Sequence, residues 1–172
     1  MNKTEKADWW FIIPASLIFF SALGVTVRDF FCVQNMTYRL DLINITGFIL
    51  FFAGITLRRV SKRILGEYYS YTVKKTQKII THSIYSHIRH PIYLAMFVYA
   101  AGIPLIFSSL CGFLIMLGLI PCTLYRIQIE EKMLLEEFGT EYRDYTEYSK
   151  KLIPTFTDKR TSSGFSLRQC QI

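Results

Sequence analysis

The stretch from Tyr85 to Tyr93 gathers side chains that can hold a ligand, among them Arg89, His90 and Tyr93. It stands directly before a long apolar run, and ionisable groups at the edge of a membrane are costly enough to count as functional candidates. Pro91 suits the first turn of a helix, whose free N–H groups and positive dipole end favour an anion. The alternative is a capped helix whose Tyr and Arg side chains reach lipid headgroups.

A second group of chemically able residues comprises Arg126, Glu130 and Glu131. Arg126 and Glu130 are four apart, so they share one face of a helix. The planar guanidinium of Arg126 suits a carboxylate, and Glu130 could hold an ammonium group. An ordinary intrahelical ion pair has the same spacing, and spacing alone favours that reading.

Other chemistry has weaker support. His82, His87 and His90 have too few carboxylate or cysteine neighbours for the three or four ligands that a metal needs, so we expect no metal. The four cysteines form no CxxC pair, which argues against a zinc ribbon or a thioredoxin-type site. Basic residues crowd the segment 58–89, but anionic lipid explains them as well as nucleic acid does, and we expect no nucleic acid.

The elements that must position these residues are four apolar runs, which predict an all-α integral membrane protein with about four transmembrane helices. The runs are Trp9–Val27, Leu42–Leu57, Ile92–Phe107 and Leu110–Tyr125. The first nearly reaches the ~20 residues that cross a bilayer as a helix. We expect the second to extend past Asp41 to Leu40, and the last two to form a helical hairpin, 92–125, with a break at Ser108-Ser109. The charged stretch 126–151 has a helical period that Gly139 divides.

Four crossings place both chain ends on one side of the membrane. The excess of basic residues in 58–89 predicts that this side is cytoplasmic, so both groups of candidate residues would face the cytoplasm. The sequence divides into N-terminal transmembrane helices (1–57), a core with the basic loop, the hairpin and a C-terminal helix (58–160), and a polar tail (161–172).

Together the two groups resemble the isoprenylcysteine carboxyl methyltransferase family and its phospholipid N-methyltransferase relatives. The resemblance covers about half of the chain, and its first two helices carry no motif. Ser83 and Ala95 stand where glycine is common in the family. The motifs are Leu65-Gly66-Glu67-Tyr68-Tyr69-Ser70, Ile84-Tyr85-x-x-x-Arg89-His90-Pro91-x-Tyr93, Glu130-Glu131-x-x-Leu134-x-x-x-Phe138-Gly139-x-Glu141-Tyr142-x-x-Tyr145 and Ile153-Pro154.

The resemblance implies a membrane methyltransferase that uses S-adenosyl-L-methionine in a pocket facing the cytoplasm. Glu130 would take the methionine ammonium, Arg126 would hold the substrate carboxylate, and Glu131 stays open as a replacement for Glu130. The substrate would be a prenylated or other lipid-linked molecule. The membrane would be the endoplasmic reticulum in a eukaryote and the inner membrane in a prokaryote. The implied cofactor walls are Gln77, Lys78, Ile79, Ile80, Tyr85, His90, Pro91, Ile92 and Tyr93.

Carboxyl methylation of an isoprenylcysteine is the leading hypothesis, because a carboxylate is already a nucleophile. N-methylation of a lipid such as phosphatidylethanolamine is the alternative, and it would need Glu131 or His90 as a base. The segment from Phe138 to Pro154 also resembles the end of the NADPH-dependent sterol reductases, although this chain is short for one. A non-enzymatic membrane protein that has kept the fold would bind no cofactor.

Overall fold

The computed structural model describes residues 3–33, 41–66 and 79–152, which form helices joined by short turns. Within these residues the β contact is an isolated parallel bridge between Ile88 and Lys150. The predicted all-α fold class is therefore confirmed. The elements are α1 (Lys3–Arg28), η1 (Asp29–Val33), α2 (Leu42–Leu65), η3 (Ser83–Ser86), α3 (Pro91–Ile106), α4 (Leu110–Leu117), α5 (Leu119–Phe138) and α6 (Thr140–Tyr148).

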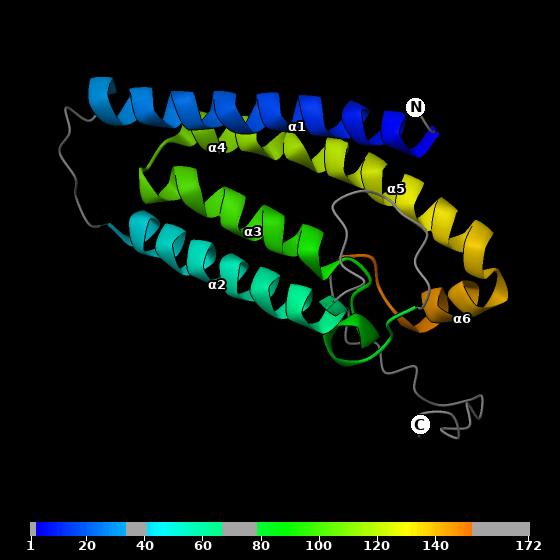
Figure 1. The fold of residues 1–172 in the computed structure, drawn as a ribbon. Helices are drawn as coiled ribbons and strands as arrows, with labels where there is room; N and C mark the ends of the chain where they lie inside the picture. The colour runs from blue at the N-terminus through cyan, green and yellow to red at the C-terminus, as the bar shows by residue number, and fades with distance from the viewer. Residues whose placement is uncertain (1–2, 34–40, 67–78, 153–172) are drawn as a thin grey trace.

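The long helices run side by side and alternate in direction, with α4 and α5 following one another along the same crossing (Figure 1). One end of the bundle, which we call the site end, holds the starts of α1 and α3, the end of α2, and α6. The opposite end, which we call the turn end, holds the turn 107–109 between α3 and α4 (Figure 1). The described chain therefore begins and ends at the site end, as an even number of crossings requires.

Among the described residues, three helical stretches are long and apolar enough to cross a membrane: Phe11–Cys32, Leu42–Leu65 and Leu110–Phe138. The fourth expected span, α3, is a shorter apolar helix of 16 residues. Large apolar side chains such as Leu17, Phe20 and Leu42 are exposed on the outside of the bundle. A surface of this kind suits contact with lipid, in agreement with the predicted membrane protein.

Glycines allow α2 and α3 to pack backbone against backbone. A Cβ added at Gly54 would lie 2.5 Å from the backbone nitrogen of Tyr99, and one at Gly47 would lie 2.5 Å from that of Ile106. Gly102 faces α2 from the other side. Small residues at such seams are the usual means by which membrane helices approach closely. This packing holds the start of α3 beside the end of α2.

The limits of α2 differ from those expected at both ends. Asp41 is its N-cap, and the Asn44 side chain accepts a hydrogen bond from the Asp41 N–H at 3.0 Å. The helix therefore begins after Asp41, and the expected extension past that residue is wrong. At the other end α2 continues through basic residues to Leu65, where Gly66 (φ 53°) donates its N–H to the Lys62 carbonyl.

The predicted hairpin is present, but its second arm is two helices, α4 and α5, that meet at Gly118. The break at Ser108-Ser109 is confirmed, since Ser108 has a φ of 50° and Ser109 Oγ accepts a hydrogen bond from the Gly112 N–H. α5 runs on from the apolar run into the charged stretch and ends at Gly139, as predicted. The division into 1–57, 58–160 and 161–172 stays a prediction, and its first boundary lies inside α2.

Candidate active site

The Tyr93 hydroxyl connects the two groups of candidate residues. It donates a hydrogen bond to Glu130 Oε2 at 2.9 Å and accepts one from Arg126 Nε at 3.1 Å. Arg126 is only 6% exposed, and its guanidinium carbon lies 4.9 Å from the centre of the Phe11 ring on α1. The reading of Arg126 and Glu130 as a simple pair within one helix is therefore incomplete, because a residue of α3 stands between them. The buried cation, the phenol and the carboxylate form one chain.

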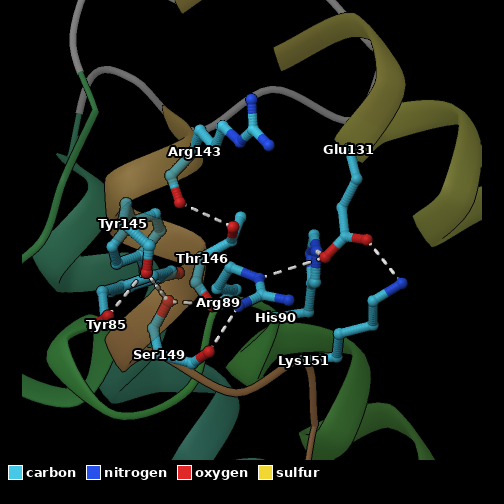
Figure 2. Close-up of polar contacts among 9 residues, drawn as sticks. All are labelled: Tyr85, Arg89, His90, Glu131, Arg143, Tyr145, Thr146, Ser149 and Lys151. Atoms are coloured by element: carbon cyan, nitrogen blue, oxygen red, sulfur yellow. Dashed lines mark hydrogen bonds and ion pairs between the residues drawn. The ribbon is translucent and has the colours of Figure 1, made fainter. Parts of the chain in front are cut away.

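Glu131, the next residue of α5, anchors a separate charged cluster (Figure 2). Its Oε1 lies 3.1 Å from Arg89 Nε and 3.5 Å from His90 Nε2, and its Oε2 lies 2.6 Å from Lys151 Nζ. The Arg89 and His90 side chains are almost fully buried, whereas that of Lys151 is half exposed. One carboxylate thus joins α5 to the start of α3 and to the segment that follows α6.

Arg89 also holds α6 in place (Figure 2). Its Nη1 donates to the carbonyl of Thr146 at 3.2 Å and to that of Ser149. The backbones join as well, since the Arg89 N–H donates to the Lys150 carbonyl at 2.7 Å and the His90 N–H to that of Lys151 at 3.1 Å. A buried arginine fully engaged by carbonyls and a carboxylate is suited to positioning its neighbours rather than to binding a ligand itself.

Two tyrosines, Tyr85 and Tyr145, connect the loop before α3 to α2 and α6. The Tyr145 hydroxyl of α6 donates to the Tyr85 carbonyl at 2.5 Å, and the Tyr85 hydroxyl donates to the Ser61 carbonyl of α2 at 3.4 Å. Burial raises the pKa of Tyr145 to about 12, so its hydroxyl stays a neutral donor. Tyr85 therefore links α2, η3 and α6, and Figure 2 places it beside Tyr145 and Ser149.

Three buried side-chain atoms have no hydrogen-bond partner in the described part of the chain: His90 Nε2, Thr123 Oγ1 and Tyr142 Oη. His90 Nε2 faces Glu131 Oε1 at 3.5 Å but makes no hydrogen bond with it. Buried polar atoms are nearly always paired, so each exception calls for an explanation. A site for a polar ligand would explain the one at His90.

The structure brings together most of the residues implied by the resemblance. His90, Tyr93, Arg126 and Glu130 meet at the site end, and Pro91 is fully buried at the first position of α3. For the isoleucines of the implied cofactor walls, the structure gives burial but no polar contact with this group. Ile92 is half-buried beside Pro91, Ile79 and Ile80 are half-buried ahead of η3, and Gln77 and Lys78 lie outside the described residues.

The cluster around Glu131 was not foreseen from the sequence. Arg89 stood in the motif and Glu131 was named as an open alternative, but nothing marked Lys151 or Ser149 as their partners. These contacts join positions far apart in the chain, and no local spacing reveals them. No three of the described histidine, cysteine, aspartate and glutamate residues gather as a metal site would require, and the absence of a metal stays a prediction.

An apolar cavity of about 360 Å³ is lined by residues of α3, α4 and α5 and by Leu152. Leu94 of α3 follows Tyr93, Leu124 of α5 precedes Arg126 by two positions, and Leu152 belongs to the segment that carries Lys151. The cavity continues between α3, α4 and α5 past Phe97 and Met116. Its lining is almost entirely apolar, which suits a hydrocarbon chain better than a polar molecule.

Comparison with known proteins gives consistent results. The model of the family Phospholipid methyltransferase matches residues 42–141. Protein-S-isoprenylcysteine O-methyltransferase of Mus musculus is 29% identical over 115 residues, which cover 64% of this chain and 39% of that protein. The protein of the same name from Tribolium castaneum is 30% identical over 113 residues, covering 63% and 40%. That from Saccharomyces cerevisiae is 29% identical over 109 residues, covering 60% and 46%.

Among solved structures, the eukaryotic intramembrane Ras methyltransferase called isoprenylcysteine carboxyl methyltransferase is similar, with a TM-score of 0.65. The alignment covers 90% of this chain and 54% of that one at 23% identity, which shows a shared fold. The chain spans two fifths to just under half of the length of these curated relatives. Because the family model covers 42–141 of 172 residues and the helical membrane fold agrees with it, the chain belongs to the phospholipid methyltransferase family.

Proposed function

We propose that this protein is a membrane methyltransferase that uses S-adenosyl-L-methionine to methylate the carboxylate of an isoprenylcysteine or a similar lipid-linked acid. The observation that carries the proposal is the chain Arg126–Tyr93–Glu130, a buried cation and a carboxylate held on one phenol, in a bundle that also contains an apolar cavity. The names of the relatives from mouse and yeast supply the reaction class and the kind of acceptor.

The residues at the site end fit the cofactor. Glu130 has a single described partner, Tyr93, and its carboxylate can accept an ammonium group. His90 Nε2 is a buried polar atom that lacks a hydrogen bond, and Pro91 and Ile92 offer apolar surface next to it. Ile79, Ile80 and Tyr85, with Gln77 and Lys78, remain proposed walls. When bound, S-adenosyl-L-methionine supplies a methyl group on a positively charged sulfur.

Glu130 suits the ammonium better than Glu131 does. Glu131 already faces Arg89 and Lys151, so both of its oxygens are engaged by cations. A ligand ammonium there would have to compete with a buried arginine, whereas at Glu130 it would meet a neutral phenol. Glu131 is therefore a positioning residue in this proposal, and Glu130 is the cofactor ligand.

Arg126 would hold the acceptor carboxylate. A carboxylate needs no base to attack a methyl group, so the work of the protein is to bring the reacting atoms to ~3–3.5 Å and to keep water away. The burial of Arg126 strengthens its attraction for an anion. Its hydrogen bond to Tyr93 fixes the guanidinium relative to Glu130. The acceptor and the cofactor would then be aligned by the same phenol.

The lipid part of the substrate would occupy the apolar cavity between α3, α4 and α5. Its volume of about 360 Å³ and its apolar lining suit a prenyl or acyl chain. Because Leu94, which lines the cavity, directly follows Tyr93 in α3, the acid would lie toward Tyr93 and Arg126. From the positive-inside rule we further propose that the site faces the cytoplasm, in the endoplasmic reticulum membrane of a eukaryote or the inner membrane of a prokaryote.

N-methylation of a phospholipid is the second candidate, because the matching family model bears that description. An amine must lose a proton before it attacks, so a base is required. Glu131 is a poor base while Arg89 and Lys151 hold it, which leaves His90 Nε2. The two products differ: a methyl ester releases methanol in alkali and an N-methyl group does not. The reductase alternative finds no support in the relatives described above.

Calorimetry with S-adenosylhomocysteine on the protein in detergent micelles tests the cofactor site. Glu130→Ala should weaken binding by tenfold or more, because a hydrogen bond to a charged group is worth about 1.5–3 kcal/mol. Glu136→Ala, an exposed change on the same helix, is the control and should bind like the wild type. Unchanged affinity in Glu130→Ala would remove Glu130 from the site, and no binding by the wild type would remove the proposed function.

A separate measurement tests the acceptor site. Arg126→Ala should bind S-adenosylhomocysteine within a few-fold of the wild type but should not form base-labile methyl ester on a prenylated cysteine. The reason is that Arg126 would contact the acceptor and not the cofactor. A loss of cofactor affinity as large as that of Glu130→Ala would contradict this separation of roles.

A further inference from the structure

The hydroxyl of Tyr142 is a buried polar group that the proposed function has not used. The residue is 3% exposed, and its oxygen has no hydrogen-bond partner in the described part of the chain. Leaving such a group unpaired costs free energy that a phenylalanine at the same position would avoid. The arrangement therefore has a cost in the unliganded protein and calls for a partner that the described residues do not supply.

The position of Tyr142 is fixed by its neighbours. Its ring packs on that of Tyr145 with centroids 6.0 Å apart, and Tyr145 is bound to the Tyr85 carbonyl. Arg89 holds the same, C-terminal end of α6 through the carbonyls of Thr146 and Ser149. The Tyr142 hydroxyl is therefore carried by a helix that both Tyr145 and Arg89 anchor to the loop before α3.

The charges around Tyr142 belong to the same site. Burial, and then the negative charge of Glu131 and to a smaller extent that of Glu130, raise the pKa of Tyr142, while the positive charge of Arg89 opposes them. The hydroxyl is therefore neutral at physiological pH and keeps a proton that it can donate. The geometric link to these charges is Arg89, which pairs with Glu131 and also holds α6, the helix that carries Tyr142.

We propose that Tyr142 is a cofactor-binding residue whose hydroxyl donates a hydrogen bond to the carboxylate of the cofactor's amino-acid end. The inference rests on the proposed function, in which Glu130 takes the ammonium group. In an α-amino acid the ammonium and the carboxylate are attached to the same carbon. The protein group that donates to the carboxylate must therefore lie close to the group that accepts from the ammonium. The ionised Glu130 and Glu131 cannot donate a hydrogen bond, whereas Tyr142 supplies a neutral donor on the helix that Arg89 connects to Glu131.

Tyr142→Phe removes the hydroxyl and leaves the ring. We expect the dissociation constant for S-adenosylhomocysteine to rise by roughly ten- to hundredfold, since a bond to a charged group is lost. The unliganded protein should be as stable to denaturant as the wild type, or more stable, because an unpaired buried hydroxyl is removed. Methylthioadenosine, which lacks the amino-acid end, should bind the variant and the wild type equally well.

Tyr145→Phe is the matched control on the same helix, because it removes a hydroxyl that already has a partner in Tyr85. It should lower stability and affect the two nucleosides to the same degree. Wild-type affinity of Tyr142→Phe for S-adenosylhomocysteine, together with weakened binding by Glu130→Ala, would overturn this inference alone. An equal loss for both nucleosides in Tyr142→Phe would show a structural role and would also overturn it. Absence of binding by the wild type would remove the proposed function itself.

Discussion

The two ends of the helical bundle hold their polar groups in opposite ways. At the turn end, Ser109 Oγ donates to Asp29 Oδ2 at 2.7 Å, and Asn44 Nδ2 donates to the Ile106 carbonyl at 2.7 Å and to Ser108 Oγ at 2.8 Å. At the site end, the buried Tyr142 hydroxyl has no hydrogen-bond partner among the described residues, and His90 Nε2 lies 3.5 Å from Glu131 Oε1 without a hydrogen bond.

This difference in hydrogen bonding distinguishes the end of the bundle that stabilises the fold from the end that we propose binds ligands. The turn end satisfies its buried polar groups within the chain, as a region selected for stability does. The site end keeps a charged cluster and unpaired atoms that weaken the fold unless a ligand binds, and natural proteins break such rules mainly at functional sites. Changes at the turn end should therefore alter stability alone, whereas changes at the site end should alter stability and ligand binding in different proportions.

The largest effect should come from Glu131→Gln, which removes the negative charge and nearly preserves the shape. Arg89 is then left buried without its counter-ion, and breaking one side of a buried pair costs about 3–5 kcal/mol. Chemical denaturation in micelles measures the stability, and calorimetry with S-adenosylhomocysteine measures the binding that depends on the position of His90. Glu137→Gln, on the exposed surface of α5, is the control. A loss below 1 kcal/mol would show that Glu131 does not hold the site end together.

At the turn end, Asn44→Ala should cost about 1–3 kcal/mol, because the carbonyl and hydroxyl partners of a side chain that is 2% exposed lose their donor. Thr46→Ala, which removes an exposed hydroxyl bonded within α2, is the control and should change stability far less. Both variants should bind S-adenosylhomocysteine like the wild type. Weaker binding by Asn44→Ala, measured on the folded fraction, would show that the two ends are coupled.

Sequence reasoning was most accurate where a local rule decides the structure. Pro91 predicts the start of α3, Ser108-Ser109 predict the turn, and Gly139 predicts the end of α5, because each depends on the backbone preference of one or two residues. The convergence of His90, Tyr93, Arg126 and Glu130 came from the family resemblance. Spacing alone offered only a pair within one helix.

The remaining features depend on contacts between distant positions. Lys151 and Ser149 reach Glu131 and Arg89 only because the chain reverses at Gly139, and nothing near residue 151 encodes that. α5 continues across Arg126 because Glu, Lys and Leu sustain a helix where the apolar run ends. The unpaired Tyr142 hydroxyl could not have been found from a motif, since burial and missing partners are properties of the fold.

The smallest effect should come from removing one exposed cation at each end of the bundle, and this pair of changes is the most sensitive test of the difference between the two ends. Lys151 is half exposed and pairs with Glu131, and Arg28 is 62% exposed and pairs with Asp29. Lys151→Met should lower stability by less than about 1 kcal/mol, and less at high salt, because solvent and ions screen such pairs. Arg28→Met should be similarly mild. Denaturation at two ionic strengths measures both variants.

The two variants should differ in their preference between ligands of different charge. Removing Lys151 leaves Glu131 less neutralised, so the cationic S-adenosyl-L-methionine should gain about two- to fivefold in affinity over the uncharged thioether S-adenosylhomocysteine. Arg28→Met should leave that ratio unchanged, since its carboxylate partner lies at the turn end, beside Ser109. An equal shift in both variants would mean that the protein's net charge, and not the local field at Glu131, sets the preference.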